Sequence, residues 1–352
     1  MKYSAADTNI FTMDKTKDKI LKALSDAEHF LSGQQLSDLM GVSRTAVWKA
    51  IGKLKDEGYE IEAVTNKGYR LINRDEADIL NQTEVEKRLT TRWAGHPVIY
   101  EEKTGSTNDD IMRMADEGAK EGTLAIASLQ TAGKGRRGRT WVSPDLGNVY
   151  MSILLRPRIA ASEAPMMTLI MALSAYDALV DQDYSQGLRF GIKWPNDLVV
   201  SVDGGPYKKF VGILTEMRLE DTEIKDVTIG IGLNLNMEDV DPAFKDTATT
   251  LCRAVGRKVN RAQIAADCWN HFEKDYEEYL AAGSLEPLIE RYRRASVNLG
   301  RKVRVLDPKG EYIGTAKDVT AEGELIVAPE DGSEDRRVGT GEVSVRGVMG
   351  YV

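Results

Sequence analysis

The sequence predicts a multidomain α+β protein, and three observations support this fold class. The chain has 352 residues, whereas a single domain usually holds about 100–150. Its first part shows helical periodicity followed by a hairpin pattern, and its middle part is rich in strands that do not alternate regularly with helices. Its last part consists of short strands separated by turns. We therefore expect a lead-in over residues 1–14, a first domain over 15–75, a linker over 76–94, a central domain over 95–295 and a last domain over 296–352.

The composition excludes several classes of protein. Hydrophobic residues make up 42% and charged residues 29% of the chain, which is typical of a soluble globular protein. No apolar run approaches the ~18–20 residues of a membrane span, and the N-terminus lacks the apolar segment of a signal peptide. The two cysteines, Cys252 and Cys268, lie far apart, which argues against a zinc cluster and a disulfide framework. We expect a cytoplasmic protein.

Charge is distributed unevenly along the chain. The formal net charge is -8 at pH 7, so the protein as a whole is no obvious binder of polyanions, although an average can hide local patches. Residues 41–74 carry seven basic and four acidic side chains, and residues 131–141 carry four basic and no acidic ones. These two positive regions are the candidates for binding an anion.

The first domain has the pattern of three helices and a hairpin within about 55 residues. A helix is expected from Lys17, a second from Ser32-Gly33 and a third over SRTAVWKAIGKLKDEG, followed by a hairpin around Asn66-Lys67-Gly68. The residues expected to face the core are Ile20, Leu21, Leu24, Leu36, Leu39, Met40, Val47, Ile51 and Leu54. This order is that of a winged helix-turn-helix, with Ser43 as the N-cap of the recognition helix.

DNA is the partner that the winged helix-turn-helix predicts. Its candidate DNA-binding residues are Ser43, Arg44, Thr45, Trp48 and Lys49 on the recognition helix, and Lys67 with Arg70 on the wing. Hydroxyl, guanidinium and ammonium groups of this kind reach phosphates or base edges. The alternative is that the basic residues form a solvated face and that the module contacts proteins. DNA binding is favoured because Trp48 is expected to face outward among residue types that contact bases, and packing in the core does not explain a tryptophan at such a position.

The loop LQTAGKGRRGRTW, residues 129–141, satisfies the G-x-G-x-x-G pattern of dinucleotide sites with Gly133, Gly135 and Gly138. That pattern requires a helix directly after it, whereas Pro144 and a β-rich run follow here. A phosphate-binding P-loop is excluded because glycine, not Ser or Thr, follows Lys134. The glycines and three arginines instead suit a flexible loop that wraps a phosphate or carboxylate. A basic surface turn remains the alternative.

Four further segments place small residues beside polar ones at predicted strand ends: TGSTNDD (104–110), KWPNDL (193–198), KKFVGILTE (208–216) and IGIGLNLN (229–236). The backbone can approach a ligand closely at such junctions. The Ser-Thr-Asn run suits a neutral polar head such as a urea, two lysines supply charge, and Asp197 suits Mg²⁺ on a nucleotide. Each segment alone also fits a helix cap, a turn or a packed strand. The last part, from about Val297, predicts a small antiparallel barrel.

Taken in order, these motifs resemble the biotin protein ligases, specifically the bifunctional type that also represses biotin synthesis genes. The resemblance covers nearly the whole chain. It implies a central domain similar to class II aminoacyl-tRNA synthetases and lipoate ligases, and a C-terminal Src-homology-3-like β-barrel. It further implies that biotin and MgATP form biotinyl-5′-AMP, that biotin passes to a lysine of the biotin carboxyl carrier protein of acetyl-CoA carboxylase, and that the adenylate-bound homodimer binds operator DNA.

The resemblance also implies roles for individual residues. Arg136, Lys193 and Lys209 are expected to be catalytic, and Asp197 to hold Mg²⁺ through ATP. The expected biotin-binding residues are Ser106, Thr107, Asn108, Gln130, Gly133, Lys134, Gly135, Arg136, Lys209, Gly212 and Leu214. The expected ATP- and adenylate-binding residues are Arg136, Arg137, Arg139, Trp141, Lys193, Asn196, Asp197 and Asn234.

The sequence departs from the family pattern at two positions. Lys134 stands where many members have arginine, and Gly105 stands where an acidic residue often precedes Ser-Thr-Asn. The second change is expected to leave the start of the following helix without a favourable negative charge. Two alternative functions stay open: a lipoate or octanoate protein ligase, and a transcription factor that senses biotin without catalysing a reaction.

Overall fold

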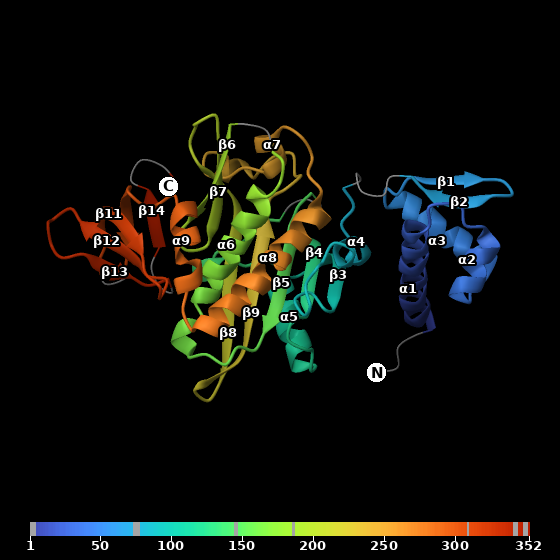
Figure 1. Cartoon of the computed structure of the whole chain (residues 1–352), viewed down its shortest axis with the longest axis horizontal. Coiled ribbons are helices and arrows are strands. Elements are labelled where there is room, and N and C mark those ends of the chain that lie inside the picture. Colours follow the sequence, from blue (N-terminus) through green and yellow to red (C-terminus); the bar gives the residue numbers. More distant parts are fainter. Residues whose placement is uncertain are drawn as a thin grey trace. The chain divides into compact units, whose positions relative to one another are not determined.

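The structure, a computed structural model, describes residues 5–72, 78–143, 147–184, 187–307, 310–340, 344–347 and 351–352 (Figure 1). The chain divides into two units, Met1–Lys87 and Arg88–Val352. The predicted connector lies partly outside the described residues, because 73–77 are not among them, and so does Pro144.

The first unit contains three helices, a hairpin and a short helix: α1 (Ala5–Asp26), α2 (Gly33–Met40), α3 (Arg44–Asp56), β1 (Ile61–Val64), β2 (Gly68–Leu71) and α4 (Gln82–Glu86). Ser43 is the N-cap of α3, as predicted, and its hydroxyl accepts a hydrogen bond from the backbone N–H of Ala46 at 3.2 Å. Ser32 and Gln35 form a capping box at α2. These caps fix where the helices begin.

The hairpin of the first unit gains a third strand-like partner. Leu31 exchanges two backbone hydrogen bonds with Tyr69 of β2, each 2.9 Å long. Gly68 has a φ of +112°, and a Cβ there would lie 2.1 Å from the Leu31 carbonyl oxygen. Only glycine fits this position, because both the backbone conformation and the close approach exclude a side chain.

Most of the predicted core of the first unit is confirmed. Ile20, Leu21, Leu24, Leu36, Val47, Ile51 and Leu54 are buried together, and Met40 packs against them partly buried. The prediction for Leu39 was wrong, since its side chain is 67% exposed. The helix expected from Lys17 begins at Ala5 in the structure. Residues 5–14 are therefore helical, where the sequence suggested an irregular lead-in.

The second unit is built around a seven-stranded sheet in the order β3-β4-β5-β9-β8-β7-β6, in which only the β3–β4 pair is parallel. Its strands are β3 (Val98–Thr104), β4 (Leu124–Gln130), β5 (Val149–Leu155), β6 (Leu188–Lys193), β7 (Asp197–Val202), β8 (Lys208–Glu220) and β9 (Glu223–Leu233). Its helices are α5 (Thr107–Asp116), α6 (Met166–Val180), α7 (Leu251–Val255), α8 (Arg261–Ala282) and α9 (Glu286–Ala295), with short 3₁₀ turns at η1 (Arg136–Gly138), η2 (Ala161–Glu163) and η3 (Pro242–Phe244).

The two faces of this sheet have different partners because side chains alternate along each strand. Met151 of β5 contacts Trp269 of α8, and Thr215 of β8 contacts Thr168 of α6. This face packs against α6 and α8, which lie side by side in Figure 1. Ser152, the next residue of β5, points the other way and contacts the start of α5. The residues on that second face line the candidate site.

Three features of the central region differ from what its sequence pattern suggests. The run KWPNDLVVS has the composition of one strand, but residues Trp194–Asn196 form the turn of the β6–β7 hairpin. Residues 261–292 have a continuous helical pattern, but the helix is interrupted at Gly283, whose left-handed conformation ends α8. A segment of sufficient length and apolarity to cross a membrane does exist, Ala161–Val180, but 72% of it is buried inside the protein. A core helix gives the same pattern.

The last part of the second unit is a five-stranded antiparallel sheet in the order β13-β12-β11-β10-β14. Its strands are β10 (Lys302–Leu306), β11 (Tyr312–Val319), β12 (Leu325–Pro329), β13 (Arg336–Val338) and β14 (Ser344–Gly347). The predicted short strands are thereby confirmed, whereas their closure into a barrel stays a prediction. The indole N–H of Trp194 donates to the Gly323 carbonyl at 3.1 Å, which ties this sheet to the β6–β7 turn.

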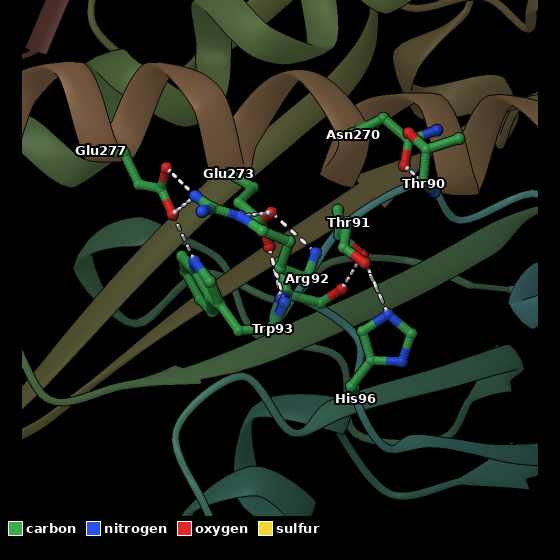
Figure 2. A network of polar contacts seen from close by, with 9 residues as sticks. Thr90, Thr91, Arg92, Trp93, His96, Asn270, Glu273 and Glu277 are labelled. Atoms are coloured by element: carbon green, nitrogen blue, oxygen red, sulfur yellow. Dashed lines mark hydrogen bonds and ion pairs between the residues drawn. The ribbon is translucent and has the colours of Figure 1, made fainter.

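A polar network attaches the start of the second unit to α8 (Figure 2). The carboxylate of Glu273 accepts hydrogen bonds from three consecutive backbone N–H groups, those of Arg92, Trp93 and Ala94, at 2.8–2.9 Å. Burial alone would raise the pKa of Glu273, but these three bonds and Arg92 outweigh it and lower the pKa. Glu277, one turn further along α8, binds the Trp93 indole and the Arg92 guanidinium.

We expect Glu273→Ala to lower the free energy of unfolding by about 2–3 kcal/mol at pH 7, because it leaves one buried and two partly buried backbone donors without their acceptor. A group whose pKa is lowered by folding stabilises the protein only while it is ionised, so the difference from wild type should shrink below about pH 4. Urea unfolding at both pH values measures the effect. Glu278→Ala, on the same helix, is the matched control, and equal losses in both variants would contradict this role.

Candidate active site

A cavity lies on the face of the seven-stranded sheet opposite α6 and α8. The space between its walls is about 450 Å³ when the open solvent at its mouth is included. Its walls come from the start of α5, the end of β4, the glycine and arginine loop, the β6–β7 turn, and β8 with β9. The lining residues are Ser106, Thr107, Asn108, Gln130, Lys134, Gly135, Arg136, Trp141, Asn196, Lys209, Gly212, Ile213, Leu214, Gly230, Ile231 and Gly232.

One end of the cavity is lined by neutral polar side chains, which carry hydroxyl or amide groups. Ser106 stands at the N-cap position of α5, yet its hydroxyl makes no capping bond to the helix. The backbone N–H of Thr107 donates to Gln130 Oε1 at 2.8 Å. The Asn108 amide donates to Glu216 Oε2 at 2.6 Å. Buried amides and hydroxyls of this kind can recognise a neutral head group by directed hydrogen bonds.

Two glycines lie in the wall of the cavity, and both positions require glycine because an aromatic ring occupies the space that a side chain would need. Gly212 of β8 pairs with Gly232 of β9, and Cβ atoms at these positions would lie 2.4 Å and 2.9 Å from the Trp141 ring. The ammonium of Lys209 lies 5.0 Å from the centroid of the same ring. Trp141 thus packs flat against the sheet, within reach of a ligand in the cavity.

The glycine and arginine loop connects the cavity to the last sheet. Arg136 donates one hydrogen bond to the Asn196 side chain at 2.9 Å and another to the Thr340 carbonyl oxygen. Burial lowers the pKa of Arg136, although a guanidinium still keeps its charge at neutral pH. Lys134 forms an ion pair with Asp109 in the first turn of α5. The loop therefore contributes two cationic side chains, Lys134 and Arg136, to the lining of the cavity.

The start of α5 corrects one expectation from the sequence. Gly105 was expected to leave this helix without a favourable charge, but Asp109 and Asp110 both lie in its first turn. Thr104 donates to Asp110 Oδ2 at 2.6 Å, which holds the second carboxylate in place.

A charged cluster adjoins the cavity where β6, β7 and β8 meet. Asp197 Oδ1 lies 2.5 Å from Lys209 Nζ, and Asp197 Oδ2 lies 3.7 Å from Lys193 Nζ. The hydroxyl of Tyr351 donates to Asp197 Oδ2 at 2.5 Å, and its ring centroid lies 4.2 Å from Lys193 Nζ. One carboxylate therefore holds two ammonium groups beside the cavity.

The titration of this cluster follows from burial and from these pairs. Burial lowers the pKa of Lys193 to about 8, although Asp197 opposes the shift. Burial alone would raise the pKa of Asp197, but Lys209 and Lys193 outweigh it and lower the pKa. The cluster is therefore cationic at neutral pH, and its charge faces the part of the cavity that holds Lys209.

The side chains that the structure describes do not by themselves form a metal site. Across the described ranges, no group of three or more His, Cys, Asp and Glu side chains is placed to hold a metal ion. The predicted metal residue, Asp197, has one oxygen at Lys209 and the other at Tyr351. A metal that arrives with a nucleotide would depend on the phosphates for its ligands, and the role of Asp197 toward it stays a prediction.

The structure brings most of the predicted ligand-binding residues to one cavity. Lys193 and Asp197 adjoin it through Lys209 rather than line it. The other predicted residues outside the lining are Gly133, Arg137, Arg139 and Asn234. The arginines at 137 and 139 are exposed, and the Asn234 side chain is held by Asn148 at 3.4 Å.

Sequence reasoning missed several residues that shape the site. Ser152 and Glu216 form hydrogen bonds with the Asn108 side chain. From the last part of the chain, Tyr351 binds Asp197 and the Thr340 carbonyl binds Arg136. The alternating glycines at 230 and 232 were a usable signal, because alternate residues of a strand share one face. Nothing local in the sequence marks Tyr351.

The predicted DNA-binding residues form a separate exposed set on the first unit. Ser43, Arg44, Thr45, Lys49 and Lys67 are exposed, and Trp48 is 66% exposed. Arg70 differs, because it pairs with Glu62 at 2.8 Å and stacks on the Phe30 ring at 4.7 Å. Its guanidinium is thus already engaged within the wing.

Comparison with known proteins places the chain in a family. Residues 101–234 match the biotin/lipoate A/B protein ligase family, residues 16–70 match a helix-turn-helix domain, and residues 299–346 match the biotin protein ligase C-terminal domain. The chain is 37% identical to the bifunctional ligase/repressor BirA of Bacillus subtilis over 90% of this chain and 94% of that protein. It is 28% identical to BirA of Escherichia coli over 93% and 96%.

A solved structure agrees with these matches. The biotin protein ligase from Aquifex aeolicus in complex with biotin and ATP superposes with a TM-score of 0.59 and 27% identity, covering 71% of this chain and 98% of that one. These matches give the class of protein, a biotin/lipoate-type ligase that carries a helix-turn-helix domain. The chain belongs to the biotin protein ligase family, of the bifunctional ligase/repressor type.

Proposed function

We propose that the protein is an ATP-dependent, AMP-forming biotin ligase. It joins biotin and ATP into biotinyl-5′-AMP with release of pyrophosphate, and it transfers biotin to one lysine of the biotin carboxyl carrier protein of acetyl-CoA carboxylase. The observation that carries this proposal is the position of Lys209. Lys209 lines the same cavity as the neutral polar groups of Thr107 and Gln130 and the guanidinium of Arg136.

This polarity matches the two halves of the first reaction. The neutral head of biotin occupies the end with the hydroxyl and amide groups, and its carboxylate then points toward Lys209. A carboxylate oxygen attacks the α-phosphorus of ATP, the new acyl–phosphate bond forms, and pyrophosphate leaves with the electrons of the broken bond. Lys209, Lys193 and Arg136 offset the charge of two approaching anions and of the transition state.

The second reaction requires that the acceptor lysine can reach the active site and that the adenylate stays bound until it does. The acceptor amine attacks the acyl carbon of the adenylate, loses a proton, and expels AMP. Arg136 is the group best placed to retain the adenylate until the acceptor arrives, because it is anchored to Asn196 and Thr340. Trp141 offers a ring surface for the adenine. Magnesium accompanies ATP and reduces the repulsion between its phosphates and the attacking carboxylate.

Transfer of a single acyl group to a carrier domain tests the proposal. The protein is incubated with MgATP, a purified biotin carboxyl carrier domain, and either biotin or lipoate. We expect a mass increase of one biotin on one lysine, and no increase with lipoate. Transfer of lipoate alone would support the related lipoate ligase function, and no transfer of either would support a biotin sensor without catalysis.

The helix-turn-helix unit supports a second activity, repression of biotin genes by the adenylate-bound protein. We infer that the operator-bound form is a homodimer, because one recognition helix covers one half-site. Gel filtration with and without biotin and ATP tests the dimer, and an unchanged mass would contradict it. The cytoplasm is the proposed compartment, where ATP, DNA and the carrier protein are present together.

Trp48 is expected to contribute to DNA affinity without contributing to stability. We expect Trp48→Ala to weaken binding about 5–30-fold, since an exposed ring on the recognition helix can pack on a base methyl or a sugar. Affinity is measured on a duplex selected by the wild-type protein from a random library, with biotin and ATP present. Leu39→Ala, at a residue of the same unit that is 67% exposed, is the control, and equal affinities for all three proteins would contradict the assignment.

The finer features of the fold are also proposed. The largely antiparallel seven-stranded sheet, with α6 and α8 on one face and α5 on the other, supports a relation of the central domain to class II aminoacyl-tRNA synthetases and lipoate ligases. The five short antiparallel strands after residue 301 support a Src-homology-3-like barrel. We keep the proposed domain bounds at 15–75, 95–295 and 296–352.

A further inference from the structure

We propose that Tyr351 is a positioning residue for the formation of the adenylate, which holds Asp197 so that this carboxylate sets the place of the Lys209 ammonium. The inference rests on the proposed function and deepens it, because it adds a residue from beyond the last strand to the first reaction. Tyr351 does not itself line the cavity. It acts through Asp197, which binds Lys209, and Lys209 does line the cavity.

Tyr351 contacts two members of the charged cluster with different parts of its side chain. Its hydroxyl donates to Asp197 Oδ2 at 2.5 Å, and the centroid of its ring lies 4.2 Å from Lys193 Nζ. Lys193 Nζ lies 3.7 Å from the same carboxylate oxygen, which is too far for a normal hydrogen bond. The hydroxyl of Tyr351, and not the ammonium of Lys193, therefore supplies the hydrogen bond to Oδ2.

A neutral donor suits this position better than a third cation. A carboxylate only accepts hydrogen bonds, so the phenol is the donor, and a hydroxyl bound to a carboxylate forms one of the stronger hydrogen bonds in proteins. Because the hydroxyl carries no charge, it fixes Oδ2 without adding to the repulsion between Lys193 and Lys209. Asp197 is buried, so water does not readily replace this bond when it is removed.

Two ammonium groups share one carboxylate, and the hydroxyl decides how it is shared. With Oδ2 bound to Tyr351, Oδ1 of Asp197 lies 2.5 Å from Lys209 Nζ, and that ammonium lies 5.0 Å from the centroid of the Trp141 ring in the cavity. Without the hydroxyl, the flexible side chain of Lys193 can close its gap to Oδ2 and turn the carboxylate toward itself. Lys209 then loses the partner that fixes its ammonium in the cavity.

The backbone next to Tyr351 is packed closely against the last strand. A Cβ at Gly347 of β14 would lie 2.2 Å from the backbone carbonyl carbon of Val352, so glycine allows the residue after Tyr351 to lie directly on the strand. Gly347 itself pairs with Val303 of β10. The position of Tyr351 thus depends on a backbone contact that a side chain would exclude, and this contact belongs to the five-stranded sheet.

The test measures biotin-dependent pyrophosphate exchange at varied biotin and ATP for the wild type, Tyr351→Phe, Asp197→Asn and the double variant. Phenylalanine keeps the ring beside Lys193 and removes only the hydroxyl. We expect Tyr351→Phe to lower kcat about 10-fold or more and to change KM for biotin less than about threefold. In the Asp197→Asn background the same change should lower kcat less than about threefold, because a residue that acts through Asp197 has little further effect once the carboxylate is gone.

Tyr312→Phe is the matched control. It removes a hydroxyl from β11 of the same sheet, where the Tyr312 ring packs 4.6 Å from the Arg336 guanidinium. Because this side chain lies outside the charged cluster, the variant should keep kcat within about twofold of wild type.

The outcomes separate this inference from the proposed function. Equal kcat in the wild type and Tyr351→Phe, or equal losses with and without Asp197→Asn, would overturn the inference alone. An undiminished kcat with a lower KM for ATP would also overturn it, because Tyr351 would then cover the nucleotide site. A wild type without biotin-dependent exchange would overturn the proposed function as well. Thermal unfolding reports whether each variant folds, and if Asp197→Asn does not, kcat of Tyr351→Phe relative to Tyr312→Phe decides the question.

Discussion

Replacement of Lys209 by methionine is expected to reduce biotin-dependent pyrophosphate exchange at least about 100–1,000-fold. In the proposed reaction Lys209 lies at the junction of the two reacting anions, and a preorganised donor at that position stabilises the transition state more than the ground state. The loss should therefore appear mainly in kcat. Asp197 keeps its contacts with Tyr351 and Lys193, so the fold should persist.

The neighbouring lysine provides a matched control for this prediction. Lys208 precedes Lys209 on the same strand, and its ammonium donates to the Lys245 carbonyl at 2.8 Å instead of the Asp197 carboxylate. Lys208→Met removes the same charge from β8 and should leave exchange within about threefold of wild type. Similar losses in both variants would show that Lys209 acts only through the general positive potential of the surface.

Arg136→Gly should release the adenylate before transfer and so relax the choice of acceptor. The side chain contributes two hydrogen bonds from a surface loop, so its loss should change the free energy of unfolding by no more than about 1–2 kcal/mol. Free biotinyl-5′-AMP is a reactive mixed anhydride that acylates exposed lysines of any protein. We expect biotin on proteins without a carrier domain, detected by streptavidin blotting.

Arg113→Ala controls for this prediction, because it removes a guanidinium that pairs with Glu117 on the exposed surface of α5. That variant should biotinylate only the carrier domain. Strict carrier specificity in Arg136→Gly would contradict the retention role of Arg136.

The first unit could be predicted from sequence because its signals are local. Helical periodicity identified the buried faces of α1 and α3, and Ser43 marked the start of α3 within one turn. Leu39 was misassigned since periodicity gives the direction of a side chain but not whether another element covers it. The short α2 leaves Leu39 exposed to solvent.

The candidate site was predictable only in part, because its geometry depends on which distant strands pair. Each motif was visible as a segment, but the placement of Gly212 beside Gly232 requires the antiparallel register of β8 and β9. The Asn108–Glu216 contact joins residues 108 positions apart. Such contacts are set by topology and packing, and a single sequence carries no local sign of them.

The cluster around Asp197 illustrates the same limit. The sequence assigned this carboxylate to a metal, because an isolated aspartate near lysines suits a nucleotide site. In the structure its two oxygens hold Lys209 and Tyr351, and its lowered pKa follows from the adjacent ammonium groups. A tyrosine so far along the chain could be connected to Asp197 only by the folded structure.

Exchange of labelled pyrophosphate into ATP is a direct test of ligase activity, because it reports the formation of the acyl adenylate without any carrier protein or DNA. The purified protein is incubated with MgATP and labelled pyrophosphate, alone, with biotin or with lipoate. We expect exchange that requires biotin and that falls at least about 100-fold in Lys209→Met. Exchange with lipoate but not with biotin, or no exchange with either, would contradict it.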